Sequence, residues 1–122
     1  MAESHDLGKK GEDIAVDHLV KNGYKILKRN WKAGKLEVDI IAENKDFCIF
    51  IEVKTRSEDY LVPPSAAVNR EKQRSIIFCA DKYVRWNNVS REIRFDVITV
   101  TMMQDETFRV EHIENAFYPT LR

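Results

Sequence analysis

Several residue types that build special structures are scarce in this 122-residue sequence, which has two cysteines, three prolines and four glycines. Cys48 and Cys79 do not form a CxxC pair, so neither a disulfide framework nor a zinc knuckle is expected. Both thiols are predicted to be small buried hydrophobes. No low-complexity tract or Gly/Ser linker divides the chain. We therefore expect a single domain over residues 1–122, with its core at about 7–115.

The sequence also lacks a long hydrophobic run. Its longest apolar stretch is the five residues 47–51, whereas about 20 are needed to span a bilayer, so no membrane partner is expected. The N-terminal residues 1–6 carry acids and no apolar core, unlike a secretory signal. This composition predicts a cytoplasmic protein.

A net charge is missing as well, because 20 Lys and Arg balance 20 Asp and Glu and the sequence pI is about 6.8. A simple nucleic-acid-binding domain has a pI above about 9. The charges are segregated, however: residues 20–36 contain six bases and no acid, and residues 60–95 contain seven bases and three acids. A charge run is usually a solvated face, but two basic segments around an acidic one favour local phosphate contacts. The candidate nucleic-acid contacts are Lys28, Arg29, Lys32, Lys35, Arg56, Lys72 and Arg74.

Hydrophobic periodicity predicts the element order α-β-β-β-α-β-β. Helices are expected at residues 7–22 and 66–86, and strands at 24–31, 36–42, 47–53, 93–101 and 107–113. The strand at 47–53 is apolar on both faces, so it is expected to be central and covered by helices on both sides. The sequence thus predicts an α/β fold with a central mixed sheet flanked by helices.

Acidic side chains occur on two of the expected strands with a period of two. Glu37 and Asp39 share one face of their strand, and Glu52 and Lys54 share one face of theirs. If these strands are neighbours, Asp39, Glu52 and Lys54 converge at one end of the sheet. Carboxylates and a main-chain carbonyl suit Mg²⁺ or Mn²⁺, and a lysine beside them can stabilise charge on a phosphate. Glu12, on the flank of the first helix, is positioned to complete the shell.

These residues occur within strings that resemble a known family. The strings are Gly8-Lys-Lys-Gly11-Glu12, Asn22-Gly23-Tyr24, Arg29-Asn30-Trp31, Glu37-Val-Asp39-Ile-Ile41-Ala42, Phe50-Ile-Glu52-Val-Lys54-Thr-Arg56, Lys72 and Arg94-Phe-Asp96-Val97. Over about residues 8–100 the chain resembles the bacterial YraN family of uncharacterised proteins, which is placed in the PD-(D/E)xK nuclease superfamily and is similar to archaeal Holliday-junction resolvases.

The resemblance implies a single nuclease-like domain with a restriction-endonuclease-like core and the activity of a Mg²⁺- or Mn²⁺-dependent phosphodiesterase. By motif match it assigns Glu12, Asp39, Glu52 and Lys54 to the catalytic acids and lysine of the superfamily. Asp39 and Glu52 are the implied metal ligands, and the family adds Glu37 and Lys72.

Two positions depart from the family pattern. Leu36 precedes Glu37 where the family has glycine, which predicts a locally different hairpin. Leu61 and Val62 replace an aromatic-glycine pair in the loop that follows Arg56. Neither departure changes an acidic residue.

Each feature also has a structural interpretation. Glu12 alone is typical of a first-turn acid that complements the helix dipole, and Glu52 with Lys54 is typical of a same-face ion pair. Glu37 is equally well explained as a solvated hairpin residue. Arg94 and Asp96 are predicted to form a structural ion pair, and His18 is predicted to be a satisfied buried histidine.

The leading hypothesis is an endonuclease that hydrolyses phosphodiester bonds in DNA, in branched or structured DNA in particular. DNA is favoured over RNA as the partner, and two nicks across a junction favour a homodimer. A non-catalytic nucleic-acid-binding module with the same fold is the main alternative. A third interpretation is an interaction protein whose acids form an ion-paired surface.

Overall fold

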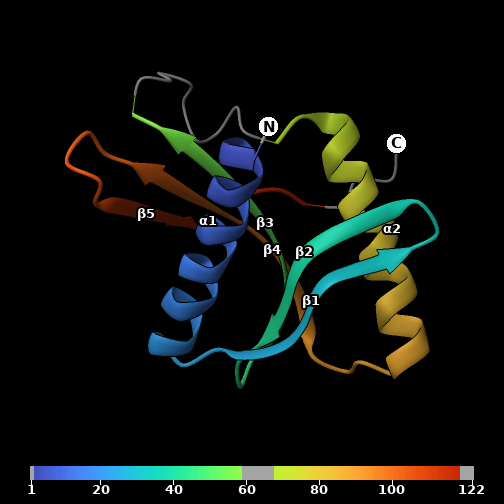
Figure 1. Cartoon of the computed structure of the whole chain (residues 1–122). Helices are drawn as coiled ribbons and strands as arrows, with labels where there is room; N and C mark the ends of the chain where they lie inside the picture. Colours follow the sequence, from blue (N-terminus) through green and yellow to red (C-terminus); the bar gives the residue numbers. More distant parts are fainter. Residues whose placement is uncertain (1, 59–67, 119–122) are drawn as a thin grey trace.

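Two helices cover opposite faces of one five-stranded sheet in the computed structural model, which describes residues 2–58 and 68–118 (Figure 1). The elements are α1 (Ala2–Lys21), β1 (Lys25–Ala33), β2 (Leu36–Glu43), β3 (Phe47–Ser57), α2 (Arg70–Asn87), β4 (Glu92–Met102) and β5 (Phe108–Ile113). The predicted element order and the α/β class are confirmed, and the arrangement is consistent with a restriction-endonuclease-like core.

The sheet is mixed, with the strand order β1-β2-β3-β4-β5. The neighbouring strands are antiparallel except β3 and β4, which pair in parallel over their full lengths. Parallel strands need a crossover connection, and α2 lies in the segment that joins β3 to β4. The predicted central strand, β3, therefore lies in the middle of the sheet.

The two faces of the sheet carry separate hydrophobic cores. On one face Ala15 and Leu19 of α1 pack in a cluster with Ile49 and Ile51 of β3. On the other face the α2 residues pack around Phe50. This alternation along β3 follows from the period of two in a strand, and explains why the segment is apolar on both faces. Cys48 and Cys79 are buried and free, as predicted.

Asparagine and glycine residues mark the helix ends. Asn69 caps α2 because its Oδ1 accepts the N–H of Lys72 at 2.8 Å, so the helix begins at Arg70 and not at the expected residue 66. Gly23, at φ 87°, follows the end of α1 as the sequence predicts. Residues 66–67 and the loop that contains Leu61 and Val62 lie outside the described residues.

The β1–β2 hairpin bends at Asn30 and Asp39. Trp31 pairs with Val38, so Asn30 lies opposite Asp39. Asn30 has a φ of 50°, a left-handed conformation that asparagine tolerates better than most residues. Beyond the bend the faces exchange: Ile40 packs in the α1-side core, whereas Val38 packs in the α2-side core. The tip of the hairpin consequently curls toward α2 (Figure 1).

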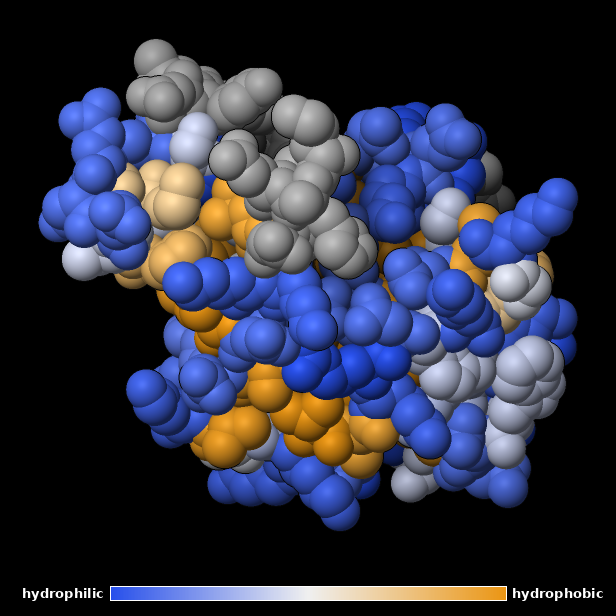
Figure 2. Space-filling view, in the orientation of Figure 1, coloured by the Kyte–Doolittle hydropathy of each residue, from blue (hydrophilic) through white to orange (hydrophobic). Residues whose placement is uncertain are grey.

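The surface in this orientation is largely hydrophilic. Figure 2 shows one apolar area between α1 and the β1–β2 hairpin, while the surface over α2 is mostly hydrophilic. No helix within residues 2–58 and 68–118 is long and apolar enough to cross a membrane.

Candidate metal centre

Asp39 lies where β2 separates from β3. The described pairing of these strands runs from Ile40 to Glu43 on β2, and it stops one residue before Asp39. The Asp39 carboxylate then takes the place of a backbone acceptor, because its Oδ2 accepts the N–H of Val53 at 2.8 Å. The bend of the hairpin thus fixes this carboxylate beside the strand residue that follows Glu52.

Glu52 is buried and faces two lysines. Its side chain is 4% exposed, and its Oε2 lies 3.5 Å from Lys54 Nζ and 3.7 Å from Lys72 Nζ. Lys54 shares a face of β3 with Glu52, and Lys72 comes from the first turn of α2. Two elements on the same side of the sheet therefore supply positive charge to one carboxylate oxygen.

The second oxygen of Glu52 is not satisfied within the protein. Oε1 is buried and has no hydrogen-bond partner. Burial, and next the negative charge of Asp39, raise the pKa of Glu52 to about 7 in spite of the opposing effect of Lys72 and Lys54. A buried, unpartnered carboxylate oxygen beside a second carboxylate is a donor set that fits a hard divalent cation.

Glu12 is tied to the bend of the hairpin. Its Oε1 accepts hydrogen bonds from Asn30 Nδ2 at 2.8 Å and from Arg29 Nη2 at 3.1 Å. Arg29 also contacts Asp13 at 2.7 Å. Since Asn30 lies opposite Asp39, one intervening residue connects Glu12 to the Asp39 position.

Glu37 lies nearer the hairpin tip, where it pairs with Lys32 across the strands. It is close enough to Cys79 for its negative charge to help raise the pKa of that thiol, of which burial is the main cause. Among residues 2–58 and 68–118, no three His, Cys, Asp or Glu side chains form a group that could hold a metal ion. The structure therefore brings Asp39, Glu52 and the two lysines together, and it places Glu12 and Glu37 in contacts of their own.

The predicted nucleic-acid contacts are of two kinds. Lys28, Lys32, Lys35 and Arg74 are exposed. The others are engaged within the protein: Arg29 with Glu12 and Asp13, Lys72 with Glu52, and Arg56 through Nε with Thr101 Oγ1 at 3.4 Å. Only the first kind leaves its charge directed at solvent.

Comparison with known proteins identifies the family. Residues 11–100 match the uncharacterised protein family UPF0102. The chain belongs to the UPF0102 family. It is 47% identical to a UPF0102 protein of Parabacteroides distasonis, with 100% of both chains covered. It is 45% identical to one of Bacteroides fragilis, with 99% of each covered, and 44% identical to one of Flavobacterium psychrophilum, with 97% and 98% covered. The YraN resemblance seen in the sequence motifs is confirmed.

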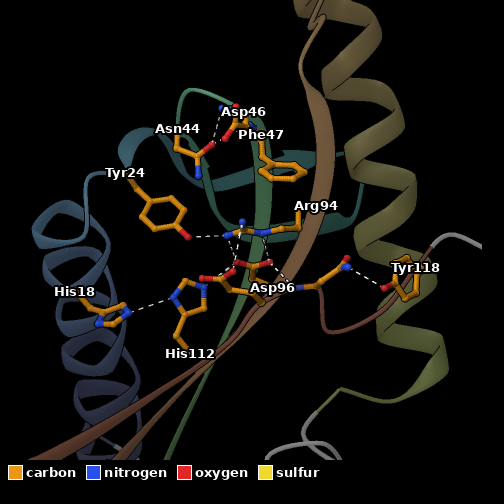
Figure 3. A network of polar contacts seen from close by, with 11 residues as sticks. His18, Tyr24, Asn44, Asp46, Phe47, Arg94, Asp96, His112 and Tyr118 are labelled. Atoms are coloured by element: carbon orange, nitrogen blue, oxygen red, sulfur yellow. Dashed lines mark hydrogen bonds and ion pairs between the residues drawn. The ribbon is translucent and has the colours of Figure 1, made fainter.

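This UPF0102 chain also contains a polar network that sequence reasoning found only in part. The predicted ion pair is present, with Arg94 Nη2 2.8 Å from Asp96 Oδ2. Arg94 also donates to the Tyr24 hydroxyl at 2.6 Å, and Asp96 contacts His112 (Figure 3). These residues come from the α1–β1 junction, β4 and β5. Spacing along one strand can indicate the Arg94–Asp96 pair, but no local pattern indicates the residues that join it from other elements.

Proposed function

We propose that this UPF0102 protein is a metal-dependent endonuclease that hydrolyses phosphodiester bonds in DNA, with branched or structured DNA as the substrate class. The observation that carries the proposal is the buried Glu52 carboxylate, which has one oxygen facing two lysines and the other without a partner. A structural ion pair needs no orphaned oxygen and no second carboxylate beside it. A phosphodiesterase centre needs both.

In this proposal Asp39 and Glu52 hold Mg²⁺ or Mn²⁺, and Glu37 is a further candidate ligand. When bound, the cation binds the scissile phosphate and lowers the pKa of a water molecule. Lys54, whose side chain is 41% exposed, is free to turn its ammonium group toward a phosphate oxygen and to stabilise the charge that develops there. Glu12 acts on the geometry, because it holds the bend that positions Asp39.

The remaining parts of the proposal concern the partner and the setting. Exposed Lys28, Lys32, Lys35 and Arg74 would contact phosphates on either side of the cut. The family resemblance favours DNA over RNA. A homodimer would supply the two sites that two opposite nicks require. The acidic N-terminus without an apolar core favours a cytoplasmic location.

Cleavage assays test the proposal directly. Labelled four-way junctions, flaps, single strands and plain duplex are incubated with the protein in Mg²⁺ or Mn²⁺ and in chelator. We expect metal-dependent cutting that falls by about 100-fold or more in Asp39→Asn, Glu52→Gln and Lys54→Met, because each removes a charge required at the phosphate. Lys45→Met is the matched control, since this exposed lysine lies in the β2–β3 turn. Absence of cutting, or equal cutting by the variants, contradicts the endonuclease.

A non-catalytic nucleic-acid-binding module is the second candidate. It is favoured by the lack of a three-acid group among the described residues and by the engagement of Glu12 with Arg29. This function predicts salt-sensitive binding of DNA that Asp39→Asn leaves unchanged, with no cleavage in any metal. Binding and cleavage measured on the same substrates therefore separate the two candidates.

A further inference from the structure

A second cluster of titratable side chains lies on the α1 face of the sheet, opposite the face that carries Glu52. His18, in the last turn of α1, and His112, on β5, approach each other with Nε2 of His18 3.1 Å from Nδ1 of His112. Figure 3 shows the two rings pointing toward each other from separate elements. Their planes are inclined by 70°, so the rings meet through their nitrogen atoms and not by stacking.

The other side of His112 is held by a buried acid. Its Nε2 lies 2.7 Å from Asp96 Oδ2, and the Asp96 side chain is 0% exposed. Hydrogen bonds from His112 and Arg94 and from the N–H of Asn115 outweigh burial and lower the pKa of Asp96, so this carboxyl group is ionised and accepts. The proton of a neutral His112 ring is therefore on Nε2, and Nδ1 presents a lone pair to His18.

This arrangement is the one in which proteins present histidine to a metal. A histidine ligand usually donates its second ring N–H to a carboxylate, which fixes the tautomer and makes the free nitrogen more basic. Arg94 in turn fixes Asp96 with two hydrogen bonds, from Nε at 2.9 Å and from Nη2 at 2.8 Å. The support behind His112 is thus already built and rigid.

We propose that His18 Nε2 and His112 Nδ1 together bind one Zn²⁺ ion. Zinc–nitrogen bonds of 2.0–2.1 Å at a tetrahedral angle separate the two nitrogens by about 3.3 Å. The nitrogens here are 3.1 Å apart, so small rotations of the rings bring both lone pairs onto one ion. Water molecules complete the coordination. Imidazole nitrogens suit Zn²⁺, whereas Mg²⁺ and Mn²⁺ suit the oxygen donors of the candidate metal centre.

The surroundings keep both rings available to the ion. His18 is half-buried, so water and metal reach it from solvent. Burial, and next the positive charge of a protonated His112, lower the pKa of His18, which favours the neutral ring that a metal requires. The bound ion would cross-link α1 to β5. This site is independent of the proposed endonuclease and of its metal.

Calorimetric titration with Zn²⁺ at pH 7.5 tests the site in the full chain. The titration is run in the wild type and in Asp39→Asn, so that the candidate metal centre does not contribute to the second experiment. We expect one Zn²⁺ per chain in both proteins and at least tenfold weaker binding in His18→Gln and in His112→Gln. His5→Gln, which changes the third histidine of the sequence, is the matched control and leaves the affinity unchanged.

Ring ¹⁵N spectra give a second readout that does not depend on a variant. Zn²⁺ is expected to shift Nε2 of His18 and Nδ1 of His112, and an equal concentration of Mg²⁺ is expected to shift neither. No Zn²⁺ binding by the wild type, unchanged affinity in both His18→Gln and His112→Gln, or loss of affinity in His5→Gln would overturn the proposal. In each of these cases the two rings are joined by a hydrogen bond alone.

Discussion

Glu52 holds a carboxyl group where its charge is poorly solvated. The group is 4% exposed, and its pKa of about 7 stands well above the ordinary value of 4.5. In the unfolded chain the same group ionises near pH 4.5, so the folded protein binds more protons than the unfolded chain between pH 4.5 and 7. Stability contributed by this residue is therefore lost as the pH rises through that interval. It is lost fully above pH 7.

Glu52→Gln is expected to stabilise the metal-free protein at pH 8. The amide keeps the size of the side chain but carries no charge, so the cost of ionising a buried carboxyl group disappears. At about 1.4 kcal/mol for each pKa unit that cost is roughly 3 kcal/mol at most, and a gain of about 1–3 kcal/mol in the free energy of unfolding is expected. Urea unfolding in the presence of a chelator measures it.

The pH dependence is the control for this prediction. At pH 5 the wild-type carboxyl group is largely protonated in the folded protein, so the gain is expected to shrink below about 1 kcal/mol. A gain that is equal at pH 5 and pH 8 would mean that packing, and not charge, explains it. A loss of stability at pH 8 would contradict the burial argument.

The sequence predicts the residues of the candidate centre better than their contacts. The period of two on a strand correctly places Glu52 and Lys54 on one face, where Lys54 Nζ lies 3.5 Å from the carboxylate. Lys72 was expected at the same end of the sheet, and it is there. The engagement of Glu12 by Arg29 and Asn30 was not predicted, because it depends on how a helix packs against a strand pair.

At the scale of elements, α1 approaches β3 tightly at Gly11. A Cβ atom at this position would lie 2.8 Å from Cγ2 and 2.9 Å from Cβ of Thr55, and it would overlap Thr55 Oγ1. Glycine is therefore required for the helix to lie this close to the strand. The neighbouring residue, Glu12, owes its position at the hairpin bend to the same approach.

Gly11→Ala is expected to destabilise the protein by about 1–3 kcal/mol, the usual cost of adding a methyl group to a packed contact. Gly8→Ala is the matched control. It lies in the same helix, and a methyl group there would have nothing within 4 Å, so alanine should raise stability by up to about 1 kcal/mol. Thr55→Ala should restore part of the loss in the double variant with Gly11→Ala. Urea unfolding of these proteins checks the prediction, and equal effects at both glycines would contradict it.

The bend of the β1–β2 hairpin is the element-scale feature that the sequence did not predict. Regular alternation would place Val38 and Ile40 on one face of the sheet, but they pack in different cores. The cause is Asn30, whose φ of 50° interrupts the strand. Asparagine is common in turns and at helix ends, so a single asparagine inside a strand pattern does not reveal which conformation it adopts.

For the whole molecule, the distribution of charge matters more than its sum. The net charge is zero, yet the hairpin carries exposed Lys28, Lys32 and Lys35 on the segment that bends toward α2. Such a surface is expected to bind phosphates locally, and each contact releases counterions. Composition alone favours the opposite expectation, because an average pI hides segregated charge.

DNA binding is expected to weaken in Lys32→Gln/Lys35→Gln and to lose part of its salt dependence. Each lost phosphate contact should lower the slope of log K against log salt by about 0.9 for duplex DNA. Fluorescence anisotropy at several salt concentrations, with chelator present, measures both quantities. Lys45→Gln, at the opposite end of β2, is the control and should leave the slope unchanged. An equal change in both variants would mean that net charge alone controls binding.

The short connection between β2 and β3 also bears on the order of folding. Asp39 and Glu52 belong to consecutive antiparallel strands joined by the three residues 44–46, so a local hairpin suffices to bring them together. Lys72 joins them only when α2 docks, and β4 pairs with β3 only after that crossover is made. Local contacts close faster than distant ones. The two carboxylates are therefore expected to meet, and to repel each other, before Lys72 reaches them, which makes the early hairpin the step most responsive to divalent cations.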